Sequence, residues 1–365
     1  MLGITVAHNI DNIGQETWDR FSAGRPFASY RWYRFGEKVM AGNRPFYILV
    51  YDQGEPVARA TFWLIDNEPL PITFKPLRSA VQKALRAYPL LVCRSPLSGT
   101  SGLILPNSPL RKPVLEAICK AAAEFGRLEK ASFMVFDYLN KDQSAADDWP
   151  GGLMKLNAGD PDTKLLIQWD SFEDYLAGLS KTAWKDYRRH RNHAARLKIN
   201  ITASSRVDRI DEALQLIRNV EIRHDNSPKP WARAMLENAH MVPCVWITAE
   251  VEDRLAGCGL LLSDQGEQVA SLLGLDYSQP YVYFQLVYQA IQQAVEQKMR
   301  VLRMGSGAYP LKMRLGCQLD NNTEVRAAWR GTFSRLGFGR ALLSQQKTVR
   351  GSFVQRLSSF NVPED

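Results

Sequence analysis

Two stretches of the chain carry the same order of hydrophobic patterns, and this repeat restricts the fold more than any other feature. Residues 45–65 and 243–263 each hold two runs rich in apolar, β-branched and aromatic residues around a short polar turn. Each pattern predicts a β-hairpin. When Phe46 is set against Cys244, the two hairpins align without a gap. The two halves of the chain are therefore expected to begin their sheets in the same way.

A further strand, an amphipathic helix and a last strand are expected after each hairpin. In the first half these are residues 89–97, 111–126 and 132–139, and in the second half residues 268–278, 282–297 and 300–306. Both helices contain an Ala-Ile-x-x-Ala core. The repeat predicts two duplicated α/β units, with chance similarity between two ordinary α/β segments as the alternative.

The length of 365 residues also favours more than one domain. The stretch 140–163 is rich in Gly, Pro, Asp and Asn, as expected of a boundary. We therefore expect an N-terminal domain over residues 1–150, a C-terminal domain over 151–325 and a basic extension over 326–365. Phe333, Phe338 and Phe353 lie among the bases of this extension, so it is expected to bind nucleic acid or a partner, or to pack on the second domain.

Several classes of protein are disfavoured by what the sequence lacks. The five cysteines form no C-x-x-C pair, which argues against a disulfide framework and a zinc site. The N-terminal region carries acids where a signal peptide would be apolar, and no window resembles a membrane span. We expect a cytoplasmic protein without a metal. Metalloprotease, serine-hydrolase and P-loop motifs are also missing.

The net charge of +8 is concentrated in two places. Residues 181–198 hold seven Lys or Arg against the single acid Asp186, and residues 325–363 hold no acid at all. The first stretch has helical spacing and is expected to continue one helix that begins at Asp170 or Ser171. Its bases are either a solvated face or a cradle for a phosphate-rich donor, such as a CoA tail or an RNA backbone. The candidate donor-binding residues there are Lys185, Arg188 and Arg189.

Several stretches of the second half carry a family resemblance: residues 171–201, "RLAGCGLLL", "LLGLDYS", the helix ending in "RVLRMGSG", and Tyr309-x-x-Lys312 before Leu315-Gly316. Through these stretches the second half resembles the FemAB/FemX-type tandem GNAT acyltransferases. The first half is similar more loosely, through residues 26–37 and the hairpin at 45–65. The resemblance implies an α/β (α+β) fold of two tandem GNAT-like domains, each a mixed, mostly antiparallel sheet flanked by helices.

The resemblance also implies amide formation, by transfer of an activated acyl or aminoacyl group to an amine of a small molecule or peptide. The donor would be aminoacyl-tRNA or an acyl thioester on CoA or a carrier protein, and no cofactor would be tightly bound. One departure matters here. The stretches that lead into the two long helices are residues 278–285 and 107–114. Neither contains the glycine-rich loop that binds a pyrophosphate at a helix N-terminus. A CoA site is thereby put in doubt, and weight shifts towards aminoacyl-tRNA.

The candidate catalytic residues lie where two central strands are expected to separate, at the ends of 268–278 and 300–306. Asp276 and Tyr277 end the first strand and could move a proton, or could simply form a turn. Lys312 could face a phosphate or a developing negative charge. Tyr309 could protonate a leaving group. The alternative for both is an exposed first helical turn.

The remaining candidates surround these four. Arg303 lies inside a strand run, so it is either a satisfied ion pair or a ligand for a substrate carboxylate. A loop within residues 221–231, after a helix at about 208–224, is expected to bind the acceptor and is called the acceptor loop below. His224 in this loop could simply be solvated. The candidate substrate-binding residues are Glu221, Arg223, His224, Asp225, Arg303 and Ser306, and Arg314 joins the candidate phosphate ligands.

A second function stays open beside the enzyme. The duplicated fold could have lost its chemistry and serve as a binding protein for RNA or an acidic partner. In addition, the small residues of 95–103 form either a tight structural turn or an anion-binding nest.

Overall fold

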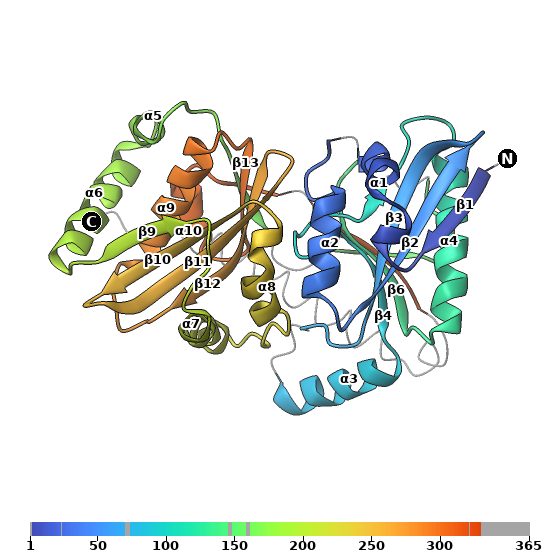
Figure 1. Cartoon of the computed structure of the whole chain (residues 1–365), viewed down its shortest axis with the longest axis horizontal. Helices are drawn as coiled ribbons and strands as arrows, with labels where there is room; N and C mark the ends of the chain where they lie inside the picture. The colour runs from blue at the N-terminus through green and yellow to red at the C-terminus, as the bar shows by residue number, and fades with distance from the viewer. Residues whose placement is uncertain are drawn as a thin grey trace.

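The computed structural model describes residues 2–22, 24–69, 74–144, 148–157, 161–320 and 322–329. They form two β-sheets that lie side by side, each flanked by helices (Figure 1). The strand order is β1-β2-β3-β4-β6-β15-β7 in the first sheet, with β5 added beside β3, and β14-β8-β13-β12-β11-β10-β9 in the second. Two mixed sheets with flanking helices are the predicted fold class, which is confirmed.

The first half contains four α-helices, one short 3-10 helix and seven strands among its described residues. In chain order its elements are β1 (Leu2–Ala7), η1 (Ile10–Asn12), α1 (Gln15–Ser22), α2 (Tyr30–Val39), β2 (Arg44–Asp52), β3 (Glu55–Ile65), α3 (Lys75–Ala87), β4 (Leu90–Cys93), β5 (Leu103–Ile104), α4 (Arg111–Leu128), β6 (Phe133–Leu139) and β7 (Met154–Asn157).

From residue 200 to residue 305 the second half repeats the main elements of this order, without counterparts of α3 and β5. Its elements are β8 (Thr163–Leu166), α5 (Phe172–Ala177), α6 (Lys181–Arg196), β9 (Asn200–Ser204), α7 (Ile210–Arg223), α8 (Ala232–Asn238), η3 (Ala239–Met241), β10 (Cys244–Val251), β11 (Arg254–Asp264), β12 (Glu267–Leu275), α9 (Val282–Glu296), β13 (Val301–Gly305), α10 (Tyr309–Arg314), β14 (Gln318–Leu319) and β15 (Glu324–Trp329).

The two sheets match strand for strand. In each sheet a hairpin pairs with a third strand, and that strand pairs in parallel with the strand after the long helix, as β4 with β6 and β12 with β13. The other strand pairs are antiparallel. The crossover helices α4 and α9 supply the long connection that a parallel pair requires. The repeat read from the sequence is therefore a structural duplication.

The gapless alignment of the two hairpins is wrong by one residue. Each hairpin closes on a two-residue turn with positive φ, at Gln53–Gly54 and at Glu252–Asp253. Aligning these turns sets Phe46 against Val245. Both of these residues are buried and belong to the cores beneath α4 and α9. A one-residue shift exchanges the two faces of a strand, so burial decides the register where sequence similarity could not.

The first sheet is not built from one continuous segment, whereas the strands of the second sheet all come from residues 163–319. Strands β7 and β15 both complete the first sheet, although they come from the predicted linker and from the end of the second half. The position that matches β15 is held in the second sheet by β8, the first strand of that half. The domain limits 150/151 and 325/326 therefore stay predictions, and most of the predicted extension lies outside the described residues.

The single helix expected from Asp170 or Ser171 is wrong, because the chain forms two helices there. Ser171 caps α5 in a capping box with Asp174, as its position before the helix suggested. The helix ends at Ala177, and Ser180 then caps α6 through a bond from the amide of Ala183. The two caps give the basic segment its own helix.

The halves share one hydrophobic core as well as having their own. Residues of α2 and the first sheet join residues of α7, α8 and the second sheet in a single buried cluster, and α2 contacts α8. Helix α4 covers the opposite face of the first sheet, and α5 and α9 cover that of the second. No helix within the described part of the chain is long and apolar enough to span a membrane.

Candidate active site

The central parallel strands of the second sheet separate after three residue pairs. Strand β12 pairs with β13 only at Glu267–Val269, opposite Val301–Arg303. The rest of β12, to Leu275, pairs with β11 alone. The polar residues that follow the two strands therefore flank a gap in the hydrogen-bonded sheet, which is the predicted position of the site.

Lys312 lies in α10, directly after this divergence, and is almost fully buried at 4% exposure. Its ammonium group donates to the carbonyls of Met304 (2.7 Å), Gly305 (3.0 Å) and Ser306 (3.4 Å). Burial lowers the pKa of Lys312 to about 8. The alternative of an exposed helical turn is thus wrong for Lys312, whose charge is held against the end of β13.

Tyr309 and Ser306 lie close to Lys312 in the chain. The Tyr309 hydroxyl donates to the carbonyl of Pro161 at 2.7 Å, which ties α10 to the start of β8. Ser306 is exposed, and its carbonyl is one of the acceptors of the Lys312 ammonium. Gly305 and Gly307 have positive φ (64° and 83°), and so does Ala308 at 48°. The glycines permit the tight path by which the strand turns back into α10.

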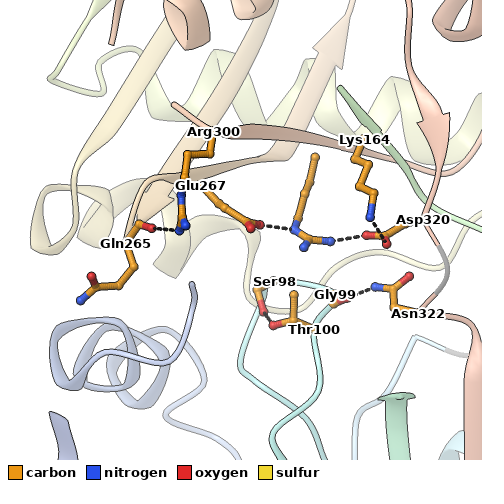
Figure 2. A network of polar contacts seen from close by, with 10 residues as sticks. Ser98, Gly99, Thr100, Lys164, Gln265, Glu267, Arg300, Asp320 and Asn322 are labelled. Carbon is orange, nitrogen blue, oxygen red and sulfur yellow. Dashed lines mark hydrogen bonds and ion pairs between the residues drawn. The ribbon is translucent and has the colours of Figure 1, made fainter. Parts of the chain in front are cut away.

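Arg303 forms ion pairs within the protein. Its guanidinium donates to Glu267 at 2.9 Å and to Asp320, which also accepts from Lys164 at 3.0 Å. Figure 2 shows this network, with the loop of Ser98 and Thr100 from the first half beside it. Of the two alternatives for Arg303, the structure shows the satisfied ion pair.

Asp276 and Tyr277 follow β12 but have different surroundings. Asp276 Oδ1 accepts bonds from the amide and hydroxyl of Ser278, which is the turn expected as its alternative. The Tyr277 ring is 45% exposed, and its hydroxyl lies 3.3 Å from His224 Nε2. Burial raises the pKa of Tyr277, and the nearby Arg223 opposes that shift. The structure therefore brings a predicted catalytic residue to the predicted acceptor loop.

The acceptor loop contains residues bound inside the protein and residues that face solvent. Glu221 is buried and accepts bonds from the amide of Lys229 at 2.8 Å and from Arg218 at 3.0 Å. The Arg223 guanidinium lies 5.4 Å from the centre of the Tyr277 ring. Asp225 lies 3.6 Å from Arg78 of α3. Glu221 is thus an internal anchor, whereas Arg223 and His224 face outwards.

The predicted donor-binding bases share one exposed face of α6. Lys185, Arg188 and Arg189 line a shallow depression of about 320 Å³ together with three further residues, which are Asn192, His193 and Arg196. Asp186 accepts from Arg189 at 2.9 Å and from Arg314 at 3.2 Å, so one acid connects these two bases. Within the described residues Lys185 and Arg188 have no carboxylate partner. This face carries net positive charge.

The N-terminus of α9 has no glycine, as the sequence showed. Tyr281 occupies the cap position with φ 70°, a left-handed conformation that is strained for a bulky residue. Its ring stacks on His193 of α6, with ring centres 4.7 Å apart. An aromatic pair therefore joins the basic helix to the point where the glycine-rich loop would lie.

Sequence reasoning missed Asp162, which lies between the two halves. Burial and the neighbouring Asp320 raise the pKa of Asp162, while Lys312 and Arg303 oppose the shift. A Cβ added at Gly99 would lie 3.1 Å from its carboxylate. Position 162 falls in the Gly- and Asp-rich stretch that predicts only a linker, so no local signal identified it.

In the first half an inserted loop lies at the equivalent of the divergence. Between β4 and β5 the chain leaves the sheet at Arg94 and returns at Gly102, and both residues bond to the backbone of Thr61. Arg94 donates to Glu68 at 2.9 Å and lies 3.7 Å from Asp137. The stretch 95–103 is thus a packed structural turn, and its neighbour Arg94 is already paired with two acids.

Comparison with known proteins agrees with this architecture. The FemAB_like family model, described as peptidoglycan biosynthesis/recognition, matches residues 9–322. A search of curated proteins finds no match.

Solved structures show the same fold at low sequence identity. A structure of FemX has a TM-score of 0.59 and 11% identity, covering 88% of this chain and 96% of that one. A tandem GNAT protein from the clavulanic acid biosynthesis pathway has a TM-score of 0.55 and 11% identity, covering 91% and 99%. The C-terminal domain of a putative lysylphosphatidylglycerol synthetase from Agrobacterium fabrum has a TM-score of 0.50 and 10% identity, covering 92% and 96%. The predicted tandem GNAT-like fold is confirmed.

Proposed function

The chain belongs to the FemAB-like family of acyltransferases, and from that premise we propose that it forms an amide by transferring an activated acyl or aminoacyl group to an amine. The acceptor is an amine of a small molecule or peptide. The donor is aminoacyl-tRNA or an acyl thioester, and we place the transfer in the second half.

One observation carries the proposal, which is the buried Lys312 beside the divergence of β12 and β13. Amine attack on an ester or thioester carbonyl develops negative charge on oxygen, and a fixed cation in a water-poor site stabilises that charge. At neutral pH Lys312 is mostly protonated, since its pKa is about 8. We propose that its positive charge, which lies at the end of β13, stabilises the negative charge that develops on the oxygen of the reacting carbonyl.

The proton of the attacking amine must also be removed. Asp276 is the better candidate of the two residues that follow β12, because the turn to Ser278 uses only its Oδ1 and leaves Oδ2 to accept the proton. Burial raises the pKa of Tyr277, which disfavours its hydroxyl as a base. The role of Tyr309 as an acid for the leaving group stays a prediction, because its hydroxyl donates to Pro161.

The basic face of α6 favours a donor that carries several phosphates. Lys185 and Arg188 are exposed and can pair with such a group, whereas the strained Tyr281 stands where a pyrophosphate loop would be. The resemblance to FemX-like enzymes implies aminoacyl-tRNA, whereas the clavulanic acid pathway protein is described in a form without AcCoA. We favour aminoacyl-tRNA. CoA and carrier-protein thioesters remain the competing donors.

Parallel transfer assays test the proposal. Radiolabelled acetyl-CoA and radiolabelled aminoacyl-tRNA are offered with a panel of amino acids and short peptides as acceptors. We expect label in an acid-stable amide product from one donor, with the tRNA reaction falling steeply as salt rises. Label transferred from neither donor would contradict the proposal and would favour the binding protein for RNA or an acidic partner.

A further inference from the structure

A group of three exposed side chains lies at the end of β12, outside the Lys312 region. The Arg223 guanidinium lies 5.4 Å from the centre of the Tyr277 ring, and the Tyr277 hydroxyl lies 3.3 Å from His224 Nε2. The ring covers part of the guanidinium and restricts its direction. The group therefore presents donors of three kinds at one place.

The acids around this group are already engaged. Glu221 accepts from Arg218 and from the amide of Lys229. Asp225 faces Arg78, and Asp276 accepts from Ser278. Within the described part of the chain, Arg223 has no carboxylate partner. Its positive charge is thus available to a ligand.

The loop that carries the group is held by both halves of the molecule. From inside, Glu221 binds the amide of Lys229, and its carbonyl accepts from the amide of Asn226 at 2.8 Å. From outside, Arg78 of α3 donates to the carbonyl of Asp225 at 3.3 Å. The Arg78 side chain is only 14% exposed. Asp225 has φ 51°, so a fixed left-handed turn orients the residues on either side of it.

Helix α3 is an insertion relative to the other half. It lies in the connection between β3 and β4, and the matching connection between β11 and β12 is the two-residue turn Gln265–Gly266. Figure 1 shows α3 reaching from the first sheet towards the loops beside α7. The duplicated fold does not need this helix for its sheet, which leaves its contact with Asp225 as a specific addition.

We propose that Arg223, His224 and Tyr277 form a subsite for a carboxylate of the acceptor, and that Arg78 positions this subsite from the first half. The inference rests on the proposed function and adds a substrate class, an amine that also carries a carboxylate. The planar fork of Arg223 matches the two oxygens of a carboxylate. His224 and the Tyr277 hydroxyl can donate to the same group.

The subsite is separate from the donor face. Helix α7 packs on β11 and β12, whereas α6 packs on α9, which covers the opposite face of the same sheet. A carboxylate bound at Arg223 and a phosphate bound at Lys185 would thus approach the divergence of β12 and β13 from different sides.

A binding experiment on the full chain tests the subsite without any transfer reaction. The Cε1–Hε1 signal of His224, one of five histidines, is assigned by its loss in His224→Gln and followed by NMR. N-acetylglycine is titrated as the carboxylate, and N-acetylglycinamide is its neutral match. We expect a saturable shift of the His224 signal with the acid only.

Three variants refine the test. Arg223→Gln should abolish the shift. Arg78→Gln should weaken the apparent affinity about two- to fivefold, the range of one partly exposed ion pair. Arg86→Gln, an exposed change on the same helix, should leave the affinity unchanged.

Two outcomes overturn the proposal. One is no saturable shift up to the solubility limit of the acid, and the other is an equal response to the amide or in Arg223→Gln. A response of Arg78→Gln equal to the wild type would remove the positioning role of α3. A failure of the transfer assays with an intact carboxylate shift would instead count against the proposed function alone.

Discussion

The two halves share strand order and register up to one point, and there they differ. Aligned on their hairpin turns, Cys93 matches Ala270 and Leu103 matches Leu273. Between these positions the second half has only residues 271–272, a one-residue irregularity, whereas the first half has residues 94–102. An insertion in a single strand thus distinguishes the first sheet from the second at the position of the divergence.

The inserted loop also changes which cation lies beside the divergence. In the first half Arg94 pairs with Glu68 and Asp137. In the second half the Lys312 ammonium donates to backbone carbonyls, and within the described residues no acid is bonded to it, although Asp162 lies near enough to affect its pKa. We infer that the first half stabilises the molecule and that the second half carries the chemistry.

The largest effect is expected from breaking the ion pair of the first half. Arg94→Met leaves Glu68 and Asp137 without their cation in a buried setting, which should lower the free energy of unfolding by about 3–5 kcal/mol. Urea unfolding measures this loss. Transfer activity below the unfolding transition should stay within about twofold of the wild type, because the chemistry is assigned elsewhere. A proportionate loss of activity in folded protein would contradict the division between the halves.

The next effect concerns the second half. Lys312→Met should lower kcat/KM about 10²- to 10³-fold, the range seen when one stabilising charge or donor is removed. Lys298→Met, which changes an exposed lysine that contacts Asp170, is the matched control and should retain activity. Circular dichroism and hydrogen exchange of β13 separate lost chemistry from lost structure. Wild-type rates in Lys312→Met would exclude Lys312 from the site.

A smaller effect is expected at the insertion itself. A Cβ at Gly102 would lie 2.7 Å from the carbonyl carbon of Arg94, so Gly102→Ala should cost about 1–3 kcal/mol by overpacking. Gly259 in β11 has only the Leu272 carbonyl nearby, at 3.9 Å, and Gly259→Ala should be much milder. Thermal unfolding of both variants gives the comparison, and equal destabilisation would argue against a tightly packed loop.

The mildest effect is a pH dependence. If protonated Lys312 is needed for transfer, kcat/KM should fall as pH rises through about 8. Well above this pH the fall should approach about tenfold per pH unit. Stability should change in the opposite direction. Because the folded-state pKa of Lys312 lies below its usual 10.5, the unfolded chain binds more protons between these values, and stability due to this group rises with pH. Lys312→Arg should remove both trends.

The sequence predicted the repeated elements well because their signals are local. The hairpins, the two long helices and the strands after them follow from hydrophobic period and turn residues. The one-residue error in alignment came from relying on residue similarity, since Phe46 and Cys244 carry no information about the turn. Strand β15 joins the first sheet by long-range pairing, which leaves no local pattern to read.

The site was predicted by position but not by contacts. Lys312 follows the last central strand, which the sequence shows, but its carbonyl partners depend on the left-handed turn at Ala308. The Arg94–Glu68 pair joins two segments separated by α3, and nothing in either segment indicates the other. Arg78 and Asp162 belong to contacts between the halves, which arise only when both sheets are assembled.

Covalent labelling tests the central assignment most directly. Photoreactive analogues of acyl-CoA and of aminoacyl-tRNA are cross-linked to the full chain, and the labelled peptides are mapped by mass spectrometry with unlabelled donor as competitor. We expect competed label from the reactive acyl end within residues 267–314, around β12, β13 and α10. Competed label within residues 90–139 of the first half would contradict the account.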